Sequence, residues 1–362
     1  MKKIISFVLG LCMTLSVGAG FTGCDKIEAL FGGERDFKNV ILVIGDGMGE
    51  NHILNAIDFY NLETPAFMED RVAYLNTNSL DGITDSAAGG TALSTGTKVH
   101  NSNVAQLDKN DLKQITSIAQ EEKMKTGVIT TDVLSGATPA SFSAHASART
   151  DGTNIRKTQA TSGIDLLLGR YTSEYTNRSD LFTDNGYTFV KNEIDLFAAK
   201  EAEKLVGVLP LIDSEYISGN EENFQLKEMT QFAVEYLEND NGFFLMIEGA
   251  YIDKHSHNNS FDFAMAETRS LIDVIDYLYE YAADGETAVF ITADHETGGL
   301  MRARDKDDCN GWLYASQDHT ATPVPLYVKN YTFKPENLGY KADAEPQNTW
   351  VFDACKAIIK GK

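Results

Sequence analysis

Three runs of almost entirely apolar residues, each followed within two residues by an acidic side chain, most strongly constrain the fold of this 362-residue chain. They are residues 40–44 before Asp46, residues 243–247 before Glu248, and residues 288–292 before Asp294 and His295. Continuous apolar runs of this length are typical of strands buried on both faces, as in a parallel sheet. We therefore expect at least three such strands in the core.

Segments with helical spacing of apolar residues alternate with these strands. We expect helices at residues 111–125, 226–239, 261–281 and 349–359, and further strands at residues 126–131 and 325–328. Strands that alternate with helices indicate a largely parallel sheet covered on both faces. The predicted fold is therefore an α/β, three-layer α/β/α sandwich around a large, mostly parallel central sheet. Residues 151–225 are polar and show no clear chemistry.

The acids that follow the three runs are expected to converge. In open α/β sheets the ligand site lies beyond the carboxyl ends of the strands. Any single acid at a strand end is more often a turn or cap residue. Three of them, one with an adjacent histidine, indicate a functional site at that edge of the sheet.

Ser86 begins an Ala- and Gly-rich segment with helix potential. A helix that starts at Asp85 and Ser86 would present unpaired N–H groups and the positive end of its dipole, which suit a phosphate group. A serine hydroxyl is a poor nucleophile until a base or a metal activates it. No histidine near Ser86 in the sequence has an obvious base spacing, so the activators are sought among the acids and histidines elsewhere. The alternative is that Asp85 and Ser86 only cap a core helix.

Histidines with a nearby acid form a second group of candidate ligands. Asp253 and His257 are four residues apart, which on a helix places both on one face and suits a single zinc ion. His255 would point elsewhere, toward the surface. His319 precedes the last expected strand and is by itself more often a structural residue than a ligand. The remaining histidines, interpreted as structural, are His52, His100 and His145.

The chain is strongly acidic. Its net charge is −22, which becomes −24 without residues 1–23, because those carry two lysines and no acids. Such a chain is not expected to bind nucleic acid. It would also repel phosphate esters at long range, so a phosphate site must be locally cationic, as bound metal ions would make it.

The N-terminal segment predicts export. Two lysines followed by the apolar residues 4–15 are typical of a secretory signal, and residues 21–24, Phe-Thr-Gly-Cys, resemble a bacterial lipobox. We expect a lipoprotein signal peptide at residues 1–23, a tether at residues 24–36 and a membrane anchor through lipidated Cys24. The protein would then face the periplasm or the cell exterior. The alternatives are cleavage near Ala19 without a lipid, or retention of the segment as an anchor. Cys309 and Cys355 would be a disulfide or two free thiols.

Several motifs, taken in chain order, resemble those of alkaline phosphatases. They are GDGMG at 45–49, DSAA at 85–88, ATPA at 137–140 with Arg149, EGAYIDK at 248–254 with His257, TADH at 292–295 and HT at 319–320. Each motif alone is weak, but together they are highly specific and cover nearly all of the chain after the signal. The resemblance implies that residues 37–362 form a single alkaline phosphatase-like catalytic domain.

The resemblance also implies two zinc ions and one magnesium ion. It assigns Asp253, His257 and His319 to a first zinc; Asp46, Asp294 and His295 to a second; and Asp46, Thr138 and Glu248 to a third site, usually magnesium.

Three further residues would act on the phosphoryl group. Ser86 would be the nucleophile beside the second zinc, Arg149 would clamp two phosphate oxygens, and Lys254 would help to hold phosphate through water. The implied reaction is hydrolysis of small-molecule phosphate monoesters to an alcohol and inorganic phosphate, through a phosphoserine intermediate. A homodimer is compatible with the resemblance.

The chain departs from the family pattern at Gly136, where relatives often carry an Asp or His that supports the third site. We expect water to fill that space and hold magnesium more weakly, so that Gly136→Asp would tighten it. The alternative is that the glycine is required by a positive φ.

Three other functions compete with this interpretation, two of them enzymatic and one a binding function. A phosphodiesterase is disfavoured by Arg149, because a diester presents one fewer free phosphate oxygen. A related sulfatase would carry a modified Cys in a Cys-x-Pro-x-Arg motif, which is absent here. A surface lipoprotein that binds phosphate or metal without turnover is disfavoured because nucleophile, clamp and zinc ligands are all present.

Overall fold

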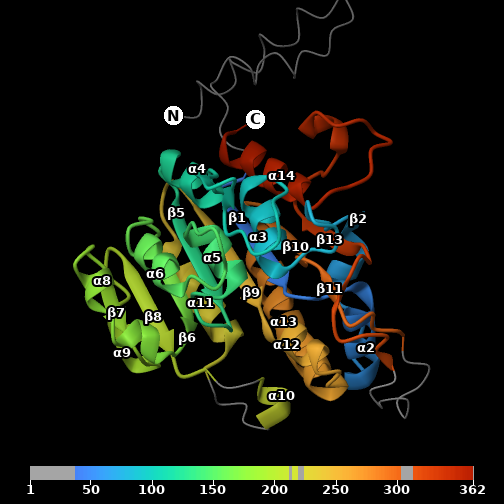
Figure 1. The fold of residues 1–362 in the computed structure, drawn as a ribbon, viewed down its shortest axis with the longest axis horizontal. Coiled ribbons are helices and arrows are strands. Elements are labelled where there is room, and N and C mark those ends of the chain that lie inside the picture. Colours follow the sequence, from blue (N-terminus) through green and yellow to red (C-terminus); the bar gives the residue numbers. More distant parts are fainter. Residues whose placement is uncertain (1–36, 212–213, 219–223, 303–312, 362) are drawn as a thin grey trace, which may run out of the picture. The chain divides into compact units, whose positions relative to one another are not determined.

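The computed structural model describes residues 37–211, 214–218, 224–302 and 313–361 (Figure 1). The expected signal peptide and tether, with Cys24, lie outside the described residues, as does Cys309. Cys355 is a buried free cysteine. None of the helices among the described residues combines the length and the apolar character needed to cross a membrane.

A nine-stranded sheet forms the centre of the fold. In spatial order its strands are β2 (Arg71–Leu75), β13 (Val324–Lys329), β10 (Thr287–Thr292), β1 (Asn39–Gly45), β9 (Phe243–Gly249), β5 (Lys125–Thr130), β6 (Leu166–Arg170), β8 (Leu205–Leu209) and β7 (Thr188–Val190). Neighbours from β10 to β7 are parallel, whereas β13 is antiparallel to β10 and β2 is antiparallel to β13. The predicted large, mostly parallel sheet is confirmed.

The three apolar runs form adjacent strands at the middle of this sheet. All residues of β1, β9 and β10 are buried, which accounts for the apolar runs within them. In the register, Ile44 of β1 lies beside Glu248 of β9 on one side and Thr292 of β10 on the other. The three strands therefore deliver their following acids to the same edge.

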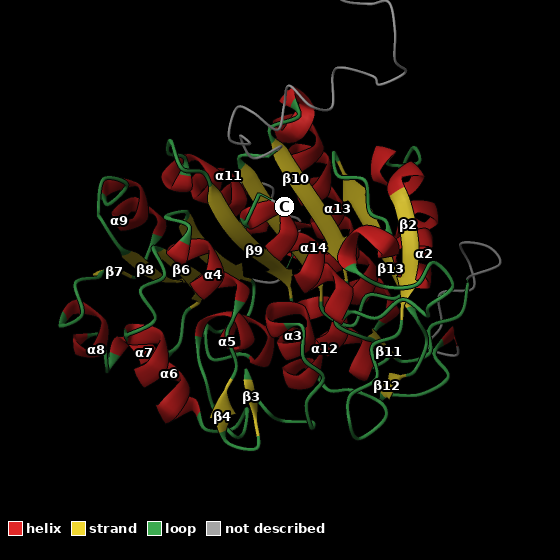
Figure 2. Cartoon of the chain, turned by 90° about the horizontal axis from the view of Figure 1, so that it is seen from above, coloured by secondary structure: helices red, strands yellow, loops and turns green. Residues whose placement is uncertain are grey.

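Helices cover both faces of the sheet (Figures 1 and 2). One layer contains α3 (Ser86–Thr95), α4 (Ile115–Glu121), α5 (Ala137–Ser143), α6 (Gly152–Ala160) and α14 (Thr349–Ile359). The opposite layer contains α2 (Glu50–Tyr60), α11 (Leu226–Leu237), α12 (Tyr251–His257) and α13 (Phe261–Tyr281). This arrangement is the predicted three-layer α/β/α sandwich.

Short elements complete the described fold. They are α7 (Ser173–Thr176), α8 (Asp180–Thr183), α9 (Glu193–Ala198), α10 (Glu215–Ser218), the 3-10 helices η2 (Ala66–Asp70), η3 (Ala282–Asp284) and η5 (Pro335–Leu338), and two small antiparallel pairs, β3 (Gln106–Leu107) with β4 (Asn110–Asp111) and β11 (Glu296–Thr297) with β12 (His319–Thr320).

The structure differs from the sequence prediction in two places. The helix expected at residues 111–125 is confined to α4, which ends before Lys123, a residue in the left-handed region with φ of 63°. Residues 151–225 contribute three strands of the main sheet, although their polar composition had given no sign of them. Two of these strands, β6 and β8, are short apolar runs within that polar segment.

Candidate active site

Ser86 is the first residue of α3, and Asp85 caps the helix by accepting a hydrogen bond from the Ala88 N–H at 3.0 Å. Every residue of this helix is buried. A Cβ at Gly89 would lie 2.9 Å from the backbone carbonyl oxygen of Asp294, so the small residues of α3 allow it to pack directly on the end of β10. The predicted helix start is confirmed, and Asp85 does act as the cap.

Three polar atoms surround Nε2 of His295. The Ser86 Oγ lies 3.2 Å from it, an Asp294 oxygen 3.2 Å and an Asp46 oxygen 3.5 Å. All four residues are buried, and the Gly47 N–H fixes the other Asp294 oxygen by donating to it at 3.1 Å. The acids that follow β1 and β10 therefore meet at the serine, as the strand order predicted. His295 is therefore the histidine beside Ser86, a proximity that no spacing in the sequence had indicated.

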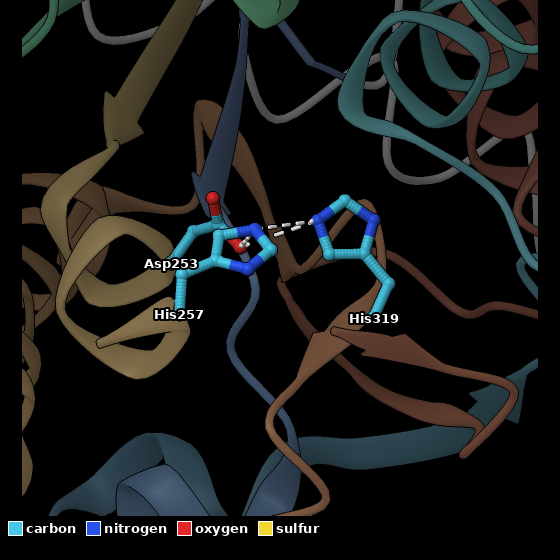
Figure 3. Close-up of side chains that lie close together, drawn as sticks. All are labelled: Asp253, His257 and His319. Atoms are coloured by element: carbon cyan, nitrogen blue, oxygen red, sulfur yellow. Dashed lines mark hydrogen bonds and ion pairs between the residues drawn. The ribbon is translucent and has the colours of Figure 1, made fainter. Parts of the chain in front are cut away.

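A second group consists of Asp253, His257 and His319 (Figure 3). Nε2 of His257 and Nε2 of His319 lie 3.3 and 3.5 Å from the same Asp253 oxygen, and 3.0 Å from each other. Asp253 and His257 project from one face of α12, as their spacing predicted, and His319 approaches from β12.

Backbone carbonyls orient both imidazoles of this group. Nδ1 of His257 lies 2.5 Å from the Gln317 carbonyl oxygen, and Nδ1 of His319 lies 2.8 Å from that of Thr84. A carbonyl at Nδ1 requires a proton there, which leaves the Nε2 lone pair for a metal. The contact with Thr84 also joins β12 to the segment that carries Ser86.

The third group predicted from the sequence lies at the ends of β1 and β9 and in α5. The Thr130 hydroxyl donates to one oxygen of Glu248, and the Thr138 hydroxyl and one Asp46 oxygen are buried with no hydrogen-bond partner among the described residues. One Asp294 oxygen is also buried with no hydrogen-bond partner among these residues. Buried polar atoms normally have partners, so three unpartnered oxygens on predicted ligands indicate that this site is built to receive cations.

Electrostatics supports the same interpretation. Burial, with the charges of Asp294 and Asp253, raises the pKa of Asp46 well above its ordinary value. Burial and Asp253 raise the pKa of Asp294 to about 7, and burial and Asp132 raise that of Glu248 to about 8. Without cations, these carboxylates repel one another in a buried space.

The histidines near these acids respond in opposite directions. Burial and the neighbouring His319 hold the pKa of His295 well below its ordinary value, so its ring is neutral. Burial acts to lower the pKa of His319, but the hydrogen bond and charge of Asp253 raise it overall. The same pairing outweighs burial at Asp253, and its pKa falls below the ordinary range. A neutral imidazole beside carboxylates is a ligand set that zinc accepts.

Two cationic side chains, Arg149 and Lys254, stand near this cluster, and each is paired with an acidic side chain. Arg149 lies 3.2 Å from an Asp85 oxygen, and its side chain is 37% exposed, so the guanidinium can still meet a ligand from solvent. Lys254 lies 2.5 Å from an oxygen of Asp132, just after β5. The predicted phosphate-contacting residues thus stand at the same edge as Ser86.

Gly136 does not leave the space that the sequence predicted. Its φ is −54°, so the alternative of a positive φ is wrong. A Cβ at this position would lie 2.7 Å from an oxygen of Asp132, so the Asp132 carboxylate borders the glycine. Asp132 precedes Gly136 by four residues, and its charge helps to raise the pKa of Glu248.

Sequence reasoning missed Asp132 and Thr297. Asp132 lies two residues beyond β5, a largely buried strand that the sequence had predicted, and that position after a strand would have identified it. Thr297 donates to Asp253 at 2.5 Å, but a threonine in a short extended segment carries no sequence signal of that contact.

The other histidines occupy structural positions. Nε2 of His52 lies 3.0 Å from the Ser256 hydroxyl, and His145 and His100 contact the Leu112 carbonyl and Asp81. His255 points away from its neighbouring ligands, as expected, but packs against aromatic rings rather than lying on the surface.

Comparison with known proteins finds similarity to alkaline phosphatases. The sequence profile of the family described as alkaline phosphatase matches residues 37–354. The chain is 33% identical over 322 residues to alkaline phosphatase 4 of Bacillus subtilis, which covers 82% of this chain and 69% of that protein. The structure of the alkaline phosphatase from the Antarctic bacterium TAB5 matches with a TM-score of 0.77 and 28% identity, over 89% of this chain and 98% of the other.

A metal-dependent hydrolase is the class of protein that this fold and these clustered ligands define. The chain belongs to the alkaline phosphatase family. It is accordingly an enzyme that hydrolyses phosphate monoesters and depends on bound metal.

Proposed function

We propose that the enzyme hydrolyses small-molecule phosphate monoesters through a phosphoserine on Ser86, at a site of two zinc ions and one magnesium ion. The observation that carries this proposal is the convergence of Ser86, Asp294 and Asp46 on Nε2 of His295, all within 3.5 Å. A nucleophile and a set of metal ligands in one buried space are what an activated serine requires.

The described residues fit the ions by their chemistry. Imidazole and carboxylate donors suit zinc. They make up the group of Asp253, His257 and His319 and a second group of Asp46, Asp253 and His295, beside which an Asp294 oxygen also lies 3.2 Å from His295. The oxygens of Asp46, Thr138 and Glu248 suit magnesium, which prefers oxygen ligands and retains water. Two variants of the TAB5 enzyme, altered at one histidine, hold Mg in a site called M3, which favours magnesium at the third site here. When bound, the metals would lower the hydroxyl pKa of Ser86 and stabilise the oxygens that attack and leave phosphorus.

The chain's own residues would carry out the rest of the reaction. The Ser86 Oγ attacks phosphorus and the alcohol leaves. Water then attacks phosphorus from the opposite side of the new Ser86 ester and releases phosphate. Two in-line displacements retain the configuration at phosphorus.

Arg149 would exchange its Asp85 partner for two phosphate oxygens, since its planar fork matches them. Lys254, held by Asp132, would contact phosphate through water. Asp132 would also face the waters of the third site, because it lies between Gly136 and Lys254 and its charge acts on Glu248.

Metal analysis combined with rate measurements tests the proposal. We expect purified protein to bind two zinc ions and one magnesium ion and to lose activity on chelation. A matched monoester should be hydrolysed much faster than the corresponding diester. A radiolabelled monoester, quenched in acid, should leave phosphate on Ser86. One metal per chain, faster diester hydrolysis or no labelled serine would contradict this proposal.

We also propose that Cys24 carries a lipid that anchors the exported enzyme to a bacterial membrane. The lipobox-like sequence at residues 21–24, after an apolar signal core, supports this. Mass spectrometry of the native N-terminus should find a diacylated cysteine at position 24, and Cys24→Ser should release the protein from membranes. A mature chain that starts before residue 24, or at residue 24 without a lipid, would contradict the anchor.

A further inference from the structure

Thr297 contacts the residues of both proposed zinc sites. Its side chain is fully buried in β11. Its hydroxyl oxygen lies 2.5 Å from Oδ1 of Asp253 and 3.2 Å from Nδ1 of His295. Asp253 belongs to the first ligand set and His295 to the second, so one hydroxyl lies between the two sets.

The backbone of Thr297 also contacts the segments that carry two more proposed ligands, Asp46 and His319. Its N–H donates to the Gly47 carbonyl oxygen at 3.1 Å, directly after Asp46. In the β11–β12 pair, Thr297 is the residue opposite His319. Thr297 therefore fixes segments that carry ligands of both sets.

Gly47 packs closely against both Thr297 and Asp253. Gly47 has a φ of 74°, and a Cβ on it would lie 2.7 Å from the Thr297 hydroxyl oxygen and 2.9 Å from Asp253. The turn after β1 thus closes directly over the hydroxyl, which only glycine allows. The hydroxyl is held at a fixed distance from the Asp46 turn.

The hydrogen-bond pattern has one consistent assignment. A carboxylate only accepts, so the single hydroxyl proton of Thr297 goes to Asp253. The hydroxyl oxygen can then only accept from His295, which places that ring's proton on Nδ1. Nε2 of His295 is left with its lone pair directed at Ser86, Asp294 and Asp46.

We propose that Thr297 is a positioning residue that couples the two zinc ligand sets, orienting Asp253 for one and selecting the metal-binding tautomer of His295 for the other. The inference rests on the proposed two-zinc function and adds the residue that makes the two sites interdependent. Residues that orient metal ligands typically change metal affinity by ~10–100-fold when altered.

Zinc affinity in three variants tests this role. Thr297→Val keeps the shape and removes the hydroxyl, whereas Thr297→Ser keeps the hydroxyl. Thr268→Val is the matched control, since Thr268 is equally buried and donates only to the Ala264 carbonyl of its own helix, α13. Zinc affinity would be measured by competition with a coloured chelator, alongside melts of the metal-free proteins.

We expect Thr297→Val to weaken zinc binding at both sites by ~10–100-fold, and Thr297→Ser and Thr268→Val to stay near wild type. Wild-type affinity in folded Thr297→Val would overturn the inference, as would equal losses in the Val and Ser variants, because packing alone would then explain them. A wild-type protein that binds no zinc would instead overturn the proposed function.

A measurement on the wild type covers the case in which Thr297→Val does not fold. Histidine-selective ¹⁵N NMR of the metal-free protein reports which ring nitrogen carries the proton. We expect the resonance assigned to His295, by comparison with a His295→Gln sample, to show Nδ1–H. A proton on Nε2 would overturn the assignment.

Discussion

The hydroxyl oxygen of Ser86 lies 3.2 Å from Nε2 of His295, although 209 positions separate the two residues in the chain. The contact exists because α3 packs at Gly89 directly against Asp294, two residues beyond the end of β10. It places the Ser86 hydroxyl beside a nitrogen that also faces the buried carboxylates of Asp46 and Asp294. The chemistry of the site depends on this junction.

Removing the hydroxyl at this junction should abolish turnover while leaving the metal sites nearly intact. We expect Ser86→Ala to lower kcat by ~10³-fold or more, the scale seen when a nucleophile is deleted, and to leave no labelled phosphoenzyme. Zinc content should stay near wild type, because the imidazole and carboxylate ligands remain. Covalent labelling of the Ala variant by a radioactive monoester would show that the nucleophile is another residue.

Arg149 should contribute binding of the phosphoryl group but not of metal. Arg149→Lys replaces a planar fork by a single ammonium, and loss of a charge-assisted hydrogen bond worth ~1.5–3 kcal/mol should lower kcat/KM by about 10- to 100-fold. Inhibition by inorganic phosphate should weaken to a similar extent, while zinc content is unchanged. Arg156→Lys is the control, since Arg156 pairs with Glu174 outside the ligand clusters. Equal inhibition by phosphate in both variants would exclude Arg149 from the phosphate site.

The metal-free protein should lose stability as pH rises from ~6.5 to ~8.5. Burial raises the folded-state pKa of Glu248 to about 8 and of Asp294 to about 7, whereas unfolded carboxyls titrate near ~4. In this window the unfolded chain therefore holds fewer protons than the folded one, and the free energy of unfolding falls with pH. His319, whose pKa is raised, acts in the same direction.

Two histidines oppose this trend only at lower pH. Burial lowers the pKa of His295 and lowers that of His52 to about 4, so they add stability as pH rises, but only up to the unfolded value near ~6.5. Melting temperatures of chelator-treated protein at several pH values provide the test, with Glu248→Gln expected to flatten the decline. A melting temperature that is constant or rises above pH ~6.5 would contradict the proposed charge cluster.

Much of the fold was accessible from the sequence because burial on both faces leaves a visible pattern. β1, β9 and β10 are central and fully buried, and their apolar runs predicted both the sheet and the edge where the acids meet. β2 lies at the edge of the sheet with mostly exposed residues, so its sequence lacked that pattern.

The finer geometry of the site was not accessible, because it depends on contacts between distant segments. The α12 spacing of Asp253 and His257 is local and was predicted correctly. By contrast, the position of His295 beside Ser86 and the position of Asp132 beside Gly136 follow from how the elements pack. The departure from the family pattern at Gly136 was therefore interpreted without knowing that Asp132 lies beside it.

Asp132 and Gly136 support the last prediction, which reverses the one made from the sequence. A new side chain at residue 136 would start 2.7 Å from one oxygen of the Asp132 carboxylate. That carboxylate would have to move, although its other oxygen is held by Lys254 at 2.5 Å. We expect Gly136→Asp to destabilise the protein by ~1–3 kcal/mol, as overpacking does, and not to tighten magnesium. Asp132→Asn, which keeps the shape but loses the charge, should weaken magnesium binding by ~10-fold.

The double variant Asp132→Ala/Gly136→Asp separates crowding from charge, because it moves the carboxylate from one position to the other. It should recover stability relative to Gly136→Asp alone, giving a coupling energy of ~1 kcal/mol or more between the two positions. Its magnesium affinity should exceed that of Asp132→Ala alone, since residue 136 then supplies the charge that residue 132 has lost. Magnesium titrations of zinc-loaded proteins, with thermal melts of each variant, provide both quantities. Tighter magnesium binding by Gly136→Asp at an unchanged melting temperature would show that Asp132 does not occupy this space in solution.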